Sequence, residues 1–202
     1  MKLAEIFFSL QGEGKNQGKP CLFIRLAGCN LHCRWCDTGY ALGEGRDIAP
    51  DVILEEVWRR NPKLICITGG EPLLQEGELE PLLASLSRKG IPVDIETNGT
   101  LDFRRLQPYA SICMDVKCPS SGEMSDLLLL GALRPEDSVK FVVSDKADLL
   151  YATEVIGSYR IAGEIFMTPV YGTDPRVIAE YLLATCLPVR FQLQLQKIIG
   201  VK

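Results

Sequence analysis

The feature that most constrains the fold of this chain is the alternation of short strand-like and helix-like segments. Short runs of β-branched and apolar residues predict strands at 22–26, 64–68, 93–96, 112–116, 139–143, 165–167 and 189–195. Stretches with helical periodicity lie between them, most clearly at 50–60 and 177–184, and each is preceded or opened by a proline. Strands joined by crossover helices form a parallel sheet, either a barrel or a doubly wound sheet.

Polar residues cluster just after the predicted strands, which favours the barrel. In a βα barrel the catalytic face lies at the carboxyl ends of the strands, and a complete barrel typically needs about 250 residues. The chain has 202 residues and no linker or repeat. We therefore expect a single domain over residues 1–202, an α/β partial (open) βα barrel with six to seven mainly parallel strands. The polar clusters are 68–72, 96–99, 115–122 and 168–172.

Composition excludes several function classes. The net charge is −4, from 22 Lys and Arg against 26 Asp and Glu, and no basic stripe is present, so we expect no nucleic-acid partner. No apolar run approaches the roughly 18 residues of a membrane helix, so we expect no membrane partner. The N-terminus lacks the pattern of a signal peptide. Eight Cys without an export signal favour a reducing compartment, which we expect to be the cytoplasm.

Three cysteines, Cys29, Cys33 and Cys36, lie close together in the loop 28–39 with the spacing C-x3-C-x2-C. A four-iron cluster used for electron transfer normally has four Cys ligands, so three thiolates leave one iron open to a small molecule. The alternatives are a zinc site or three unrelated thiols. Structural zinc takes four nitrogen or sulfur ligands, and His32, the only histidine, lies between two of the cysteines where it cannot easily reach the same ion. We expect the remaining cysteines to be small core residues, namely Cys21, Cys66, Cys113, Cys118 and Cys186.

The cysteine triad with Trp35, followed by the Gly-Gly-Glu-Pro segment at 69–72, resembles the radical S-adenosylmethionine enzymes. In that superfamily the amino and carboxylate groups of S-adenosylmethionine chelate the open iron. The reduced cluster then cleaves the sulfonium to a 5′-deoxyadenosyl radical. The resemblance therefore implies two cofactors, a 4Fe-4S cluster held by Cys29, Cys33 and Cys36, and S-adenosylmethionine.

A narrower resemblance rests on segments 9–14, 23–25, 37–38, 96–99 and 115–117, which are similar to those of the 7-carboxy-7-deazaguanine synthase family. This resemblance extends from about residue 5 to the C-terminus. It implies a lyase that converts 6-carboxy-5,6,7,8-tetrahydropterin to 7-carboxy-7-deazaguanine with loss of ammonia, in the 7-deazapurine pathway to queuosine or archaeosine. The ring contraction in that family is a radical reaction that also needs Mg²⁺ and regenerates S-adenosylmethionine.

The resemblance implies a set of cofactor-binding residues, in which the backbone of Gly69 and Gly70 pairs with the amino group of the methionine moiety. The full set is Trp35, Cys36, Asp37, Gly69, Gly70, Glu71, Thr97, Asn98, Cys118, Pro119, Ser120, Thr168, Pro169, Val170 and Tyr171. Thr38 is the implied Mg²⁺ ligand, and a hydroxyl oxygen beside an acid suits an ion that keeps several waters.

The implied substrate site combines a cation with polar groups. A carboxylate is best held by a planar bidentate cation such as Arg25, although Arg25 could instead form a surface salt bridge. The Gln11 amide suits a pterin edge, although the segment could be a plain glycine-rich turn. Thr38 could likewise be only a turn residue. The full substrate set is Leu10, Gln11, Gly12, Glu13, Arg25, Thr68, Gln196 and Lys202.

The C-terminal segment departs from the family pattern. The family commonly has a His-Lys pair near its end, whereas this chain has Gln196-Lys197, so Gln196 takes the place of a histidine. Gln retains the ability to donate and to accept a hydrogen bond. Lys202 is expected to close the pocket with its terminal carboxylate. Glu13, Glu71 and Glu96 are acids that bind substrate or brace loops, and no proton-transfer group is assigned among them.

Two other functions remain as alternatives. A glycyl-radical enzyme activase shares the cysteine triad and the chain length, but its protein substrate does not need a pocket for a carboxylate and a pterin. A non-catalytic iron-sulfur protein would not need a polar barrel mouth. By resemblance we also expect an electron donor such as flavodoxin or ferredoxin, and a homodimer that covers an exposed sheet edge.

Overall fold

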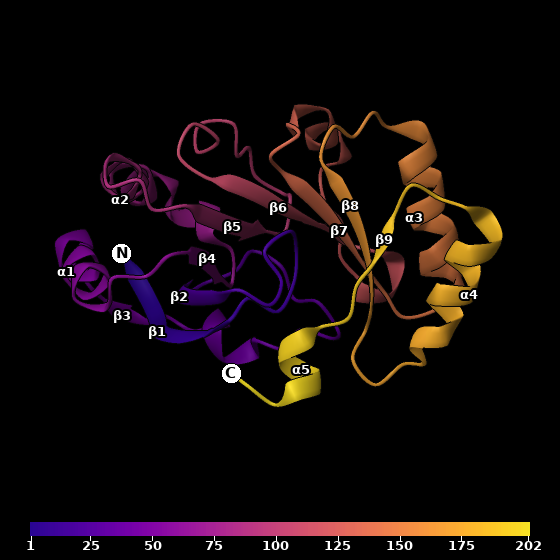
Figure 1. The fold of residues 1–202 in the computed structure, drawn as a ribbon, viewed down its shortest axis with the longest axis horizontal. Helices are drawn as coiled ribbons and strands as arrows, with labels where there is room; N and C mark the ends of the chain where they lie inside the picture. The colour runs from indigo at the N-terminus through magenta and orange to yellow at the C-terminus, as the bar shows by residue number, and fades with distance from the viewer.

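The strands of the chain form one curved sheet whose two edges do not meet (Figure 1). The computed structural model describes residues 1–202. The strand order is β3-β1-β2-β4-β5-β6-β7-β8-β9; β1 is antiparallel to both of its neighbours and all other pairs are parallel. The strands are β1 (Lys2–Leu10), β2 (Pro20–Leu26), β3 (Arg46–Asp47), β4 (Ile65–Gly69), β5 (Val93–Thr97), β6 (Ser111–Val116), β7 (Ser138–Val143), β8 (Glu164–Pro169) and β9 (Arg190–Phe191).

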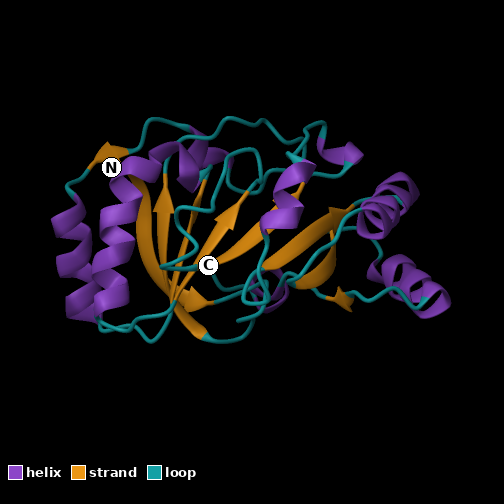
Figure 2. Ribbon diagram, turned by 90° about the horizontal axis from the view of Figure 1, so that it is seen from above, coloured by secondary structure: helices purple, strands orange, loops and turns teal.

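Helices flank the curved sheet, with α1 and α2 at one end and α3 and α4 at the other (Figures 1 and 2). Pro50 opens α1, where its missing N–H is not needed, and Asn61 ends it in a left-handed conformation. The helices are α1 (Pro50–Arg60), α2 (Glu76–Arg88), α3 (Lys146–Ser158), α4 (Pro175–Thr185) and α5 (Leu195–Ile199). Short 3-10 turns are η1 (Gly39–Leu42), η2 (Pro72–Gln75), η3 (Pro119–Ser121) and η4 (Leu127–Ala132).

The two faces of the sheet differ in chemistry because side chains alternate along each strand. One face is apolar: Ile24, Ile67 and Ile95 are neighbours in register, are fully buried, and belong to the main hydrophobic core. Burial of each such side chain contributes about 1.5–3 kcal/mol. The other face carries polar residues, including the register neighbours Asp115 and Lys140. The core therefore fixes the sheet, and the polar face is left to line a site.

The predicted fold class is confirmed, with two corrections to the strands. The parallel strands β2 and β4 to β9 match the predicted six or seven, but the sheet has nine because β1 and β3 add an antiparallel edge. Only Leu3 is buried in β1, so that strand has little periodic signal. The strand predicted at 189–195 is wrong beyond Phe191. There the Gly14 N–H donates to Gln192 Oε1 (2.7 Å), and the chain turns away into α5.

Four of the five remaining cysteines are core residues as expected, namely Cys21, Cys66, Cys113 and Cys118. Cys186 is an exception because it is exposed at the C-terminal end of α4, with a left-handed φ of 51°. Its helix buries only Ile178, so little apolar surface is available there to cover a thiol. No helix of the structure is long and apolar enough to span a membrane.

Candidate active site

A cavity of about 590 Å³ opens at the carboxyl ends of the parallel strands and brings together most of the residues predicted for the site. Every predicted substrate residue lines it, as do all three cysteines of the cluster loop. The other predicted residues on its wall are Trp35, Asp37, Thr38, Gly69, Gly70, Thr97, Asn98, Val170 and Tyr171. Segments distant in the sequence thus line one cavity.

The cluster loop presents three free thiols to this cavity. The Cys29 sulfur accepts hydrogen bonds from the Leu31 N–H (3.4 Å) and the Asn98 amide (3.9 Å). Burial raises the pKa of the Cys33 thiol, and the nearby Lys117 ammonium opposes that rise. Such donors and a cation stabilise thiolate ligands, so the loop has the chemistry that a three-Cys iron-sulfur cluster requires.

No three His, Cys, Asp or Glu side chains converge closely enough to hold a single metal ion. This arrangement does not favour the zinc alternative, in which the ligands would surround one ion. In a cubic cluster the thiolates bind different irons, and they need not converge. The donor set therefore fits the cluster better than it fits zinc.

Gly70 allows the strand end of β4 to approach the cluster loop closely. A Cβ at this position would overlap the Gly28 carbonyl oxygen and lie 2.9 Å from the Cys29 Cβ. The Gly70 N–H donates to the Leu26 carbonyl (3.1 Å), and the Glu71 N–H donates to the Gly28 carbonyl (2.8 Å). Gly70 is thus required for the seating of the loop, whatever its role toward a cofactor.

Arg25 projects from β2 into the cavity and is only partly neutralised by protein groups. Its Nε donates to Glu5 Oε1 (3.0 Å) on the neighbouring strand β1. Tyr40 also donates to this carboxylate (2.8 Å), and Lys202 forms an ion pair with it. Because no protein acceptor engages the terminal guanidinium nitrogens of Arg25, its planar fork is available to a ligand carboxylate.

Lys140, in the middle of β7, is buried among three carboxylates. It forms an ion pair with Glu13 and lies 3.5 Å from Glu96 and 3.8 Å from Asp115. Burial would raise the pKa of Glu13, but the charge of Lys140 and hydrogen bonds from Lys140, Gln194 and Gln196 lower it to about 2. Burial would lower the pKa of Lys140, yet Glu13 and Glu96 hold it well above its ordinary value. Asp115 has a second cation, Lys117, at 3.0 Å.

Gln196 lies against Gly12. A side chain at position 12 would overlap the Gln196 amide. Its Nε2 donates to Glu13 Oε1 (3.2 Å), which fixes the direction of the amide, and Gln194 donates to the same oxygen (2.8 Å). The Gln196 Oε1 is buried without a protein partner. This acceptor is therefore left for a ligand donor.

Thr38 and Lys202 lie at the cavity rim. The Thr38 hydroxyl donates to Asp37 Oδ1 (3.3 Å), so a hydroxyl and a carboxylate oxygen lie together, as hard-cation ligands do. The Lys202 backbone oxygen accepts a hydrogen bond from the Ser9 hydroxyl (2.5 Å). The C-terminus therefore reaches the cavity wall by way of β1.

Six predicted cofactor residues lie outside the cavity wall. Glu71 is fully buried and accepts hydrogen bonds from Leu73 N (3.0 Å), Thr97 Oγ1 (2.9 Å) and Asn98 N (2.7 Å), so it braces the loops after β4 and β5. Ser120 supports the wall from behind by accepting a hydrogen bond from the Trp35 indole (3.0 Å). The others are Cys118, Pro119, Thr168 and Pro169.

Sequence reasoning missed several residues on the cavity wall, most notably Lys140 and Lys197. Lys197 pairs with Asp37 at 2.8 Å. A detectable signal existed for Lys140, since a lone Lys inside the apolar run of β7 is rarely buried unless it is paired. Alternation along β6 likewise places Asp115 and Lys117 on one face.

The fold and the cysteine loop define the class of protein. An open parallel barrel with a three-Cys loop at the carboxyl ends of its strands is the arrangement of a radical S-adenosylmethionine enzyme, and residues 23–117 match the family model of the radical SAM superfamily. Membership of this superfamily implies a 4Fe-4S cluster and S-adenosylmethionine.

The chain belongs to the 7-carboxy-7-deazaguanine synthase family within that superfamily. It is 53% identical to the 7-carboxy-7-deazaguanine synthase of Methanospirillum hungatei, covering 100% of this chain and 86% of the relative. It is 39% identical to that of Koribacter versatilis, covering 98% and 96%. The structure of QueE from Escherichia coli matches with a TM-score of 0.77 and 25% identity over 96% of this chain and 93% of that one.

Proposed function

We propose that the chain converts 6-carboxy-5,6,7,8-tetrahydropterin to 7-carboxy-7-deazaguanine with loss of ammonia. Its relatives carry the name of this product. The observation that supports the proposal best is the shared cavity, because Cys29, Cys33 and Cys36 line the same space as Arg25, Gln11 and Glu13. A radical source and a pocket for a carboxylated heterocycle are thus contiguous.

Cys29, Cys33 and Cys36 would hold the 4Fe-4S cluster, which together with S-adenosylmethionine would supply a radical able to abstract a substrate hydrogen. We propose that Gly69, Gly70, Trp35 and Tyr171 contact the cofactor. The protein would exclude water and hold the reacting carbon beside the radical. This positioning removes the entropy cost of bringing two separate reactants together.

The substrate carboxylate is proposed to bind the free guanidinium fork of Arg25 and an Mg²⁺ held by Thr38. The pterin edge would bind Gln11, the Glu13 carboxylate and the free Oε1 of Gln196. Support comes from the depressed pKa of Glu13, since an ionised carboxylate accepts hydrogen bonds from the amino and ring N–H groups of a pterin. Gln196 provides the acceptor that the family histidine position would otherwise supply.

Three further expectations accompany this function and rest on resemblance. They are an electron donor of the flavodoxin or ferredoxin type, a homodimer and a cytoplasmic location. The clustered free thiols support a reducing compartment.

Anaerobic turnover tests the proposal. Protein reconstituted with iron and sulfide, then given dithionite, S-adenosylmethionine, Mg²⁺ and carboxytetrahydropterin, should yield the deazaguanine acid and ammonia in equal amounts. If the protein forms no product but generates a glycyl radical on a glycyl-radical enzyme, it is an activase instead.

A further inference from the structure

Glu96, on β5, differs electrostatically from the other carboxylates of the cavity. The ion-pair network that includes Glu96 joins three carboxylates, Glu13, Glu96 and Asp115, to only two ammonium groups, Lys117 and Lys140. Lys140 pairs closely with Glu13, and Lys117 pairs with Asp115 at 3.0 Å. Glu96 has only the more distant contact to Lys140, at 3.5 Å, and so has no cation of its own.

Burial raises the pKa of Glu96; the Lys140 charge opposes this rise, and the Glu13 charge adds to it. The pKa of Glu13, by contrast, is lowered to about 2. The pKa values of two carboxyl groups around one lysine are therefore shifted in opposite directions. Glu13 is shifted toward the ionised form and Glu96 toward the protonated form. This asymmetry is how enzymes separate an acid from a base within one site.

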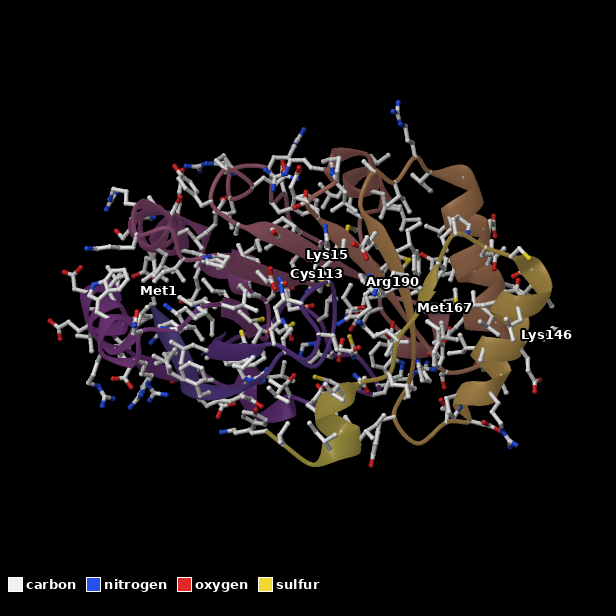
Figure 3. The ribbon with its side chains drawn as sticks, viewed as in Figure 1. Met1, Lys15, Cys113, Lys146, Met167 and Arg190 are labelled. Atoms are coloured by element: carbon white, nitrogen blue, oxygen red, sulfur yellow. The ribbon has the colours of Figure 1, made fainter.

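All the elements packed around Glu96 contribute to this environment. Cys66 and Cys113 are held protonated, because burial raises their pKa well above the ordinary value. A second, smaller cavity adjoins Glu96 and Glu13 at the amino ends of the strands, where Lys15 and Cys113 lie (Figure 3). The titratable groups that act on Glu96 are Glu13, Cys21, Cys66, Asp94, Cys113 and Lys140. Lys15 and Glu136 line the second cavity with it, and Asp115 shares its partner Lys140.

Other buried acids do not meet the same conditions. Burial raises the pKa of Glu71 and of Asp94 as well. Both carboxylate oxygens of Glu71, however, accept hydrogen bonds from backbone and hydroxyl donors. Neither Glu71 nor Asp94 lines the substrate cavity. Lys140 is too weak an acid to give up its proton, since its carboxylate neighbours raise its pKa. Glu96 alone combines a raised pKa, a position on the cavity wall and a carboxyl without a dedicated cation.

We propose that Glu96 is the catalytic acid that protonates the leaving nitrogen when ammonia is lost. This inference rests on the proposed function, which requires that loss. Glu96 transfers its carboxyl proton to nitrogen while the C–N bond breaks, and the bonding electron pair stays on nitrogen. The ring proton released as the product becomes aromatic restores the carboxylic acid, so the step consumes no external reagent and releases only ammonia.

Glu96→Gln tests the assignment because it keeps the size and hydrogen bonding of the side chain but cannot donate an acidic proton. With substrate deuterated on its saturated ring carbons, Glu96→Gln should still transfer deuterium to S-adenosylmethionine, because the radical step precedes ammonia loss. Ammonia release should fall about 100-fold or more, the contribution typical of general acid catalysis. Glu96→Asp should recover part of the rate.

The matched control is Glu154→Gln, which makes the same chemical change on α3, away from both cavities. It should keep ammonia release within a few-fold of the wild-type rate. In the wild type, ammonia release should decline as pH rises through the raised pKa of Glu96, since the protonated form is the donor. Glu96→Gln should lack this decline.

A measurement without cofactor or substrate separates this inference from the proposed function. Infrared difference spectra of wild type minus Glu96→Gln, recorded across a pH titration, should show the carbonyl band of a protonated carboxyl group above the ordinary Glu pKa of about 4.3. Wild-type protein that shows this band but releases no ammonia would reject the proposed function and, with it, the catalytic role. Absence of the band, wild-type ammonia release by Glu96→Gln, or loss of deuterium transfer in both Glu96 variants would overturn the assignment alone.

Discussion

At the scale of single residues, the site depends on positions that require either a glycine or a thiol side chain. Gly70 is one, because the Gly28 carbonyl occupies the space of a Cβ. Cys33 is another, because it is one of the three thiols of the cluster loop that line the cavity.

Gly70→Ala should displace the cluster loop and lower the iron bound after reconstitution, since the Gly28 and Cys29 backbone cannot yield without breaking the hydrogen bond between Glu71 N–H and the Gly28 carbonyl. Iron content and the visible cluster spectrum measure this effect. Gly77→Ala is the control, because Gly77 lies in α2 with open space around it. That change should leave iron content unaltered and stabilise the helix by up to about 1 kcal/mol. Equal iron in the two variants would contradict the seating role of Gly70.

Cys33→Ala should give a folded protein that is colourless and inactive, because one iron loses its thiolate. Circular dichroism checks the fold and iron analysis checks the cluster. Cys186→Ala removes an exposed thiol at the end of α4 and should keep full iron content. If Cys33→Ala retained its iron and its turnover, Cys33 would not be a cluster ligand.

At the scale of elements, the loop between β1 and β2 and the C-terminal segment hold each other over the cavity. The Leu195 N–H donates to the Gly12 carbonyl (3.1 Å), and the Gln17 amide donates to the Leu193 carbonyl (2.6 Å). In Figure 1 the helix α5 lies below the sheet, with the C-terminus on the side of β1 and β2. These contacts bring Gln196 and Lys202 to the cavity wall.

Deletion of residues 195–202 should raise the Kd for the pterin at least tenfold while the protein stays folded. The segment supplies cavity-lining groups, yet α5 buries no residue. Calorimetric titration of the reconstituted protein measures the affinity. The paired substitution Ile198→Ser and Ile199→Ser changes only the exposed side of α5 and should leave the affinity unchanged. A truncated chain that binds as tightly as the full chain would show that α5 is not part of the site.

Sequence reasoning predicts the parts of this molecule that depend on local pattern. The parallel strands and their polar carboxyl ends follow from short-range periodicity, and all the predicted substrate residues lie on one cavity. The edge strand β1 escapes prediction because its side chains are only partly buried and its pairing with β2 and β3 stabilises it. The ion pair of Lys140 could not be predicted for a different reason. Its partner Glu13 lies 127 residues away in the chain.

At the scale of the whole molecule, the charge network in the barrel links stability to pH. The pKa of Glu13 is depressed to about 2 in the folded state by Lys140, against about 4.3 in the unfolded chain. A depressed carboxyl pKa contributes stability that is complete above the unfolded value and is lost as pH falls toward the folded value. That contribution amounts to roughly 3 kcal/mol.

Glu13→Gln should therefore be less stable than the wild type at pH 6, and the difference should narrow as the pH falls from 5 toward 2. Urea unfolding at a series of pH values measures both free energies. Parallel pH profiles for the two proteins would mean that the Glu13 and Lys140 ion pair does not carry this stability.

The most direct test of the central claim is the fate of deuterium during turnover. Substrate deuterated on its saturated ring carbons is given to the reduced, reconstituted wild-type protein, and S-adenosylmethionine is recovered for mass spectrometry together with the product. The proposed reaction predicts deuterium in the recovered S-adenosylmethionine and one ammonia per deazaguanine acid. Unlabelled S-adenosylmethionine, with 5′-deoxyadenosine accumulating and no deazaguanine acid formed, would contradict it.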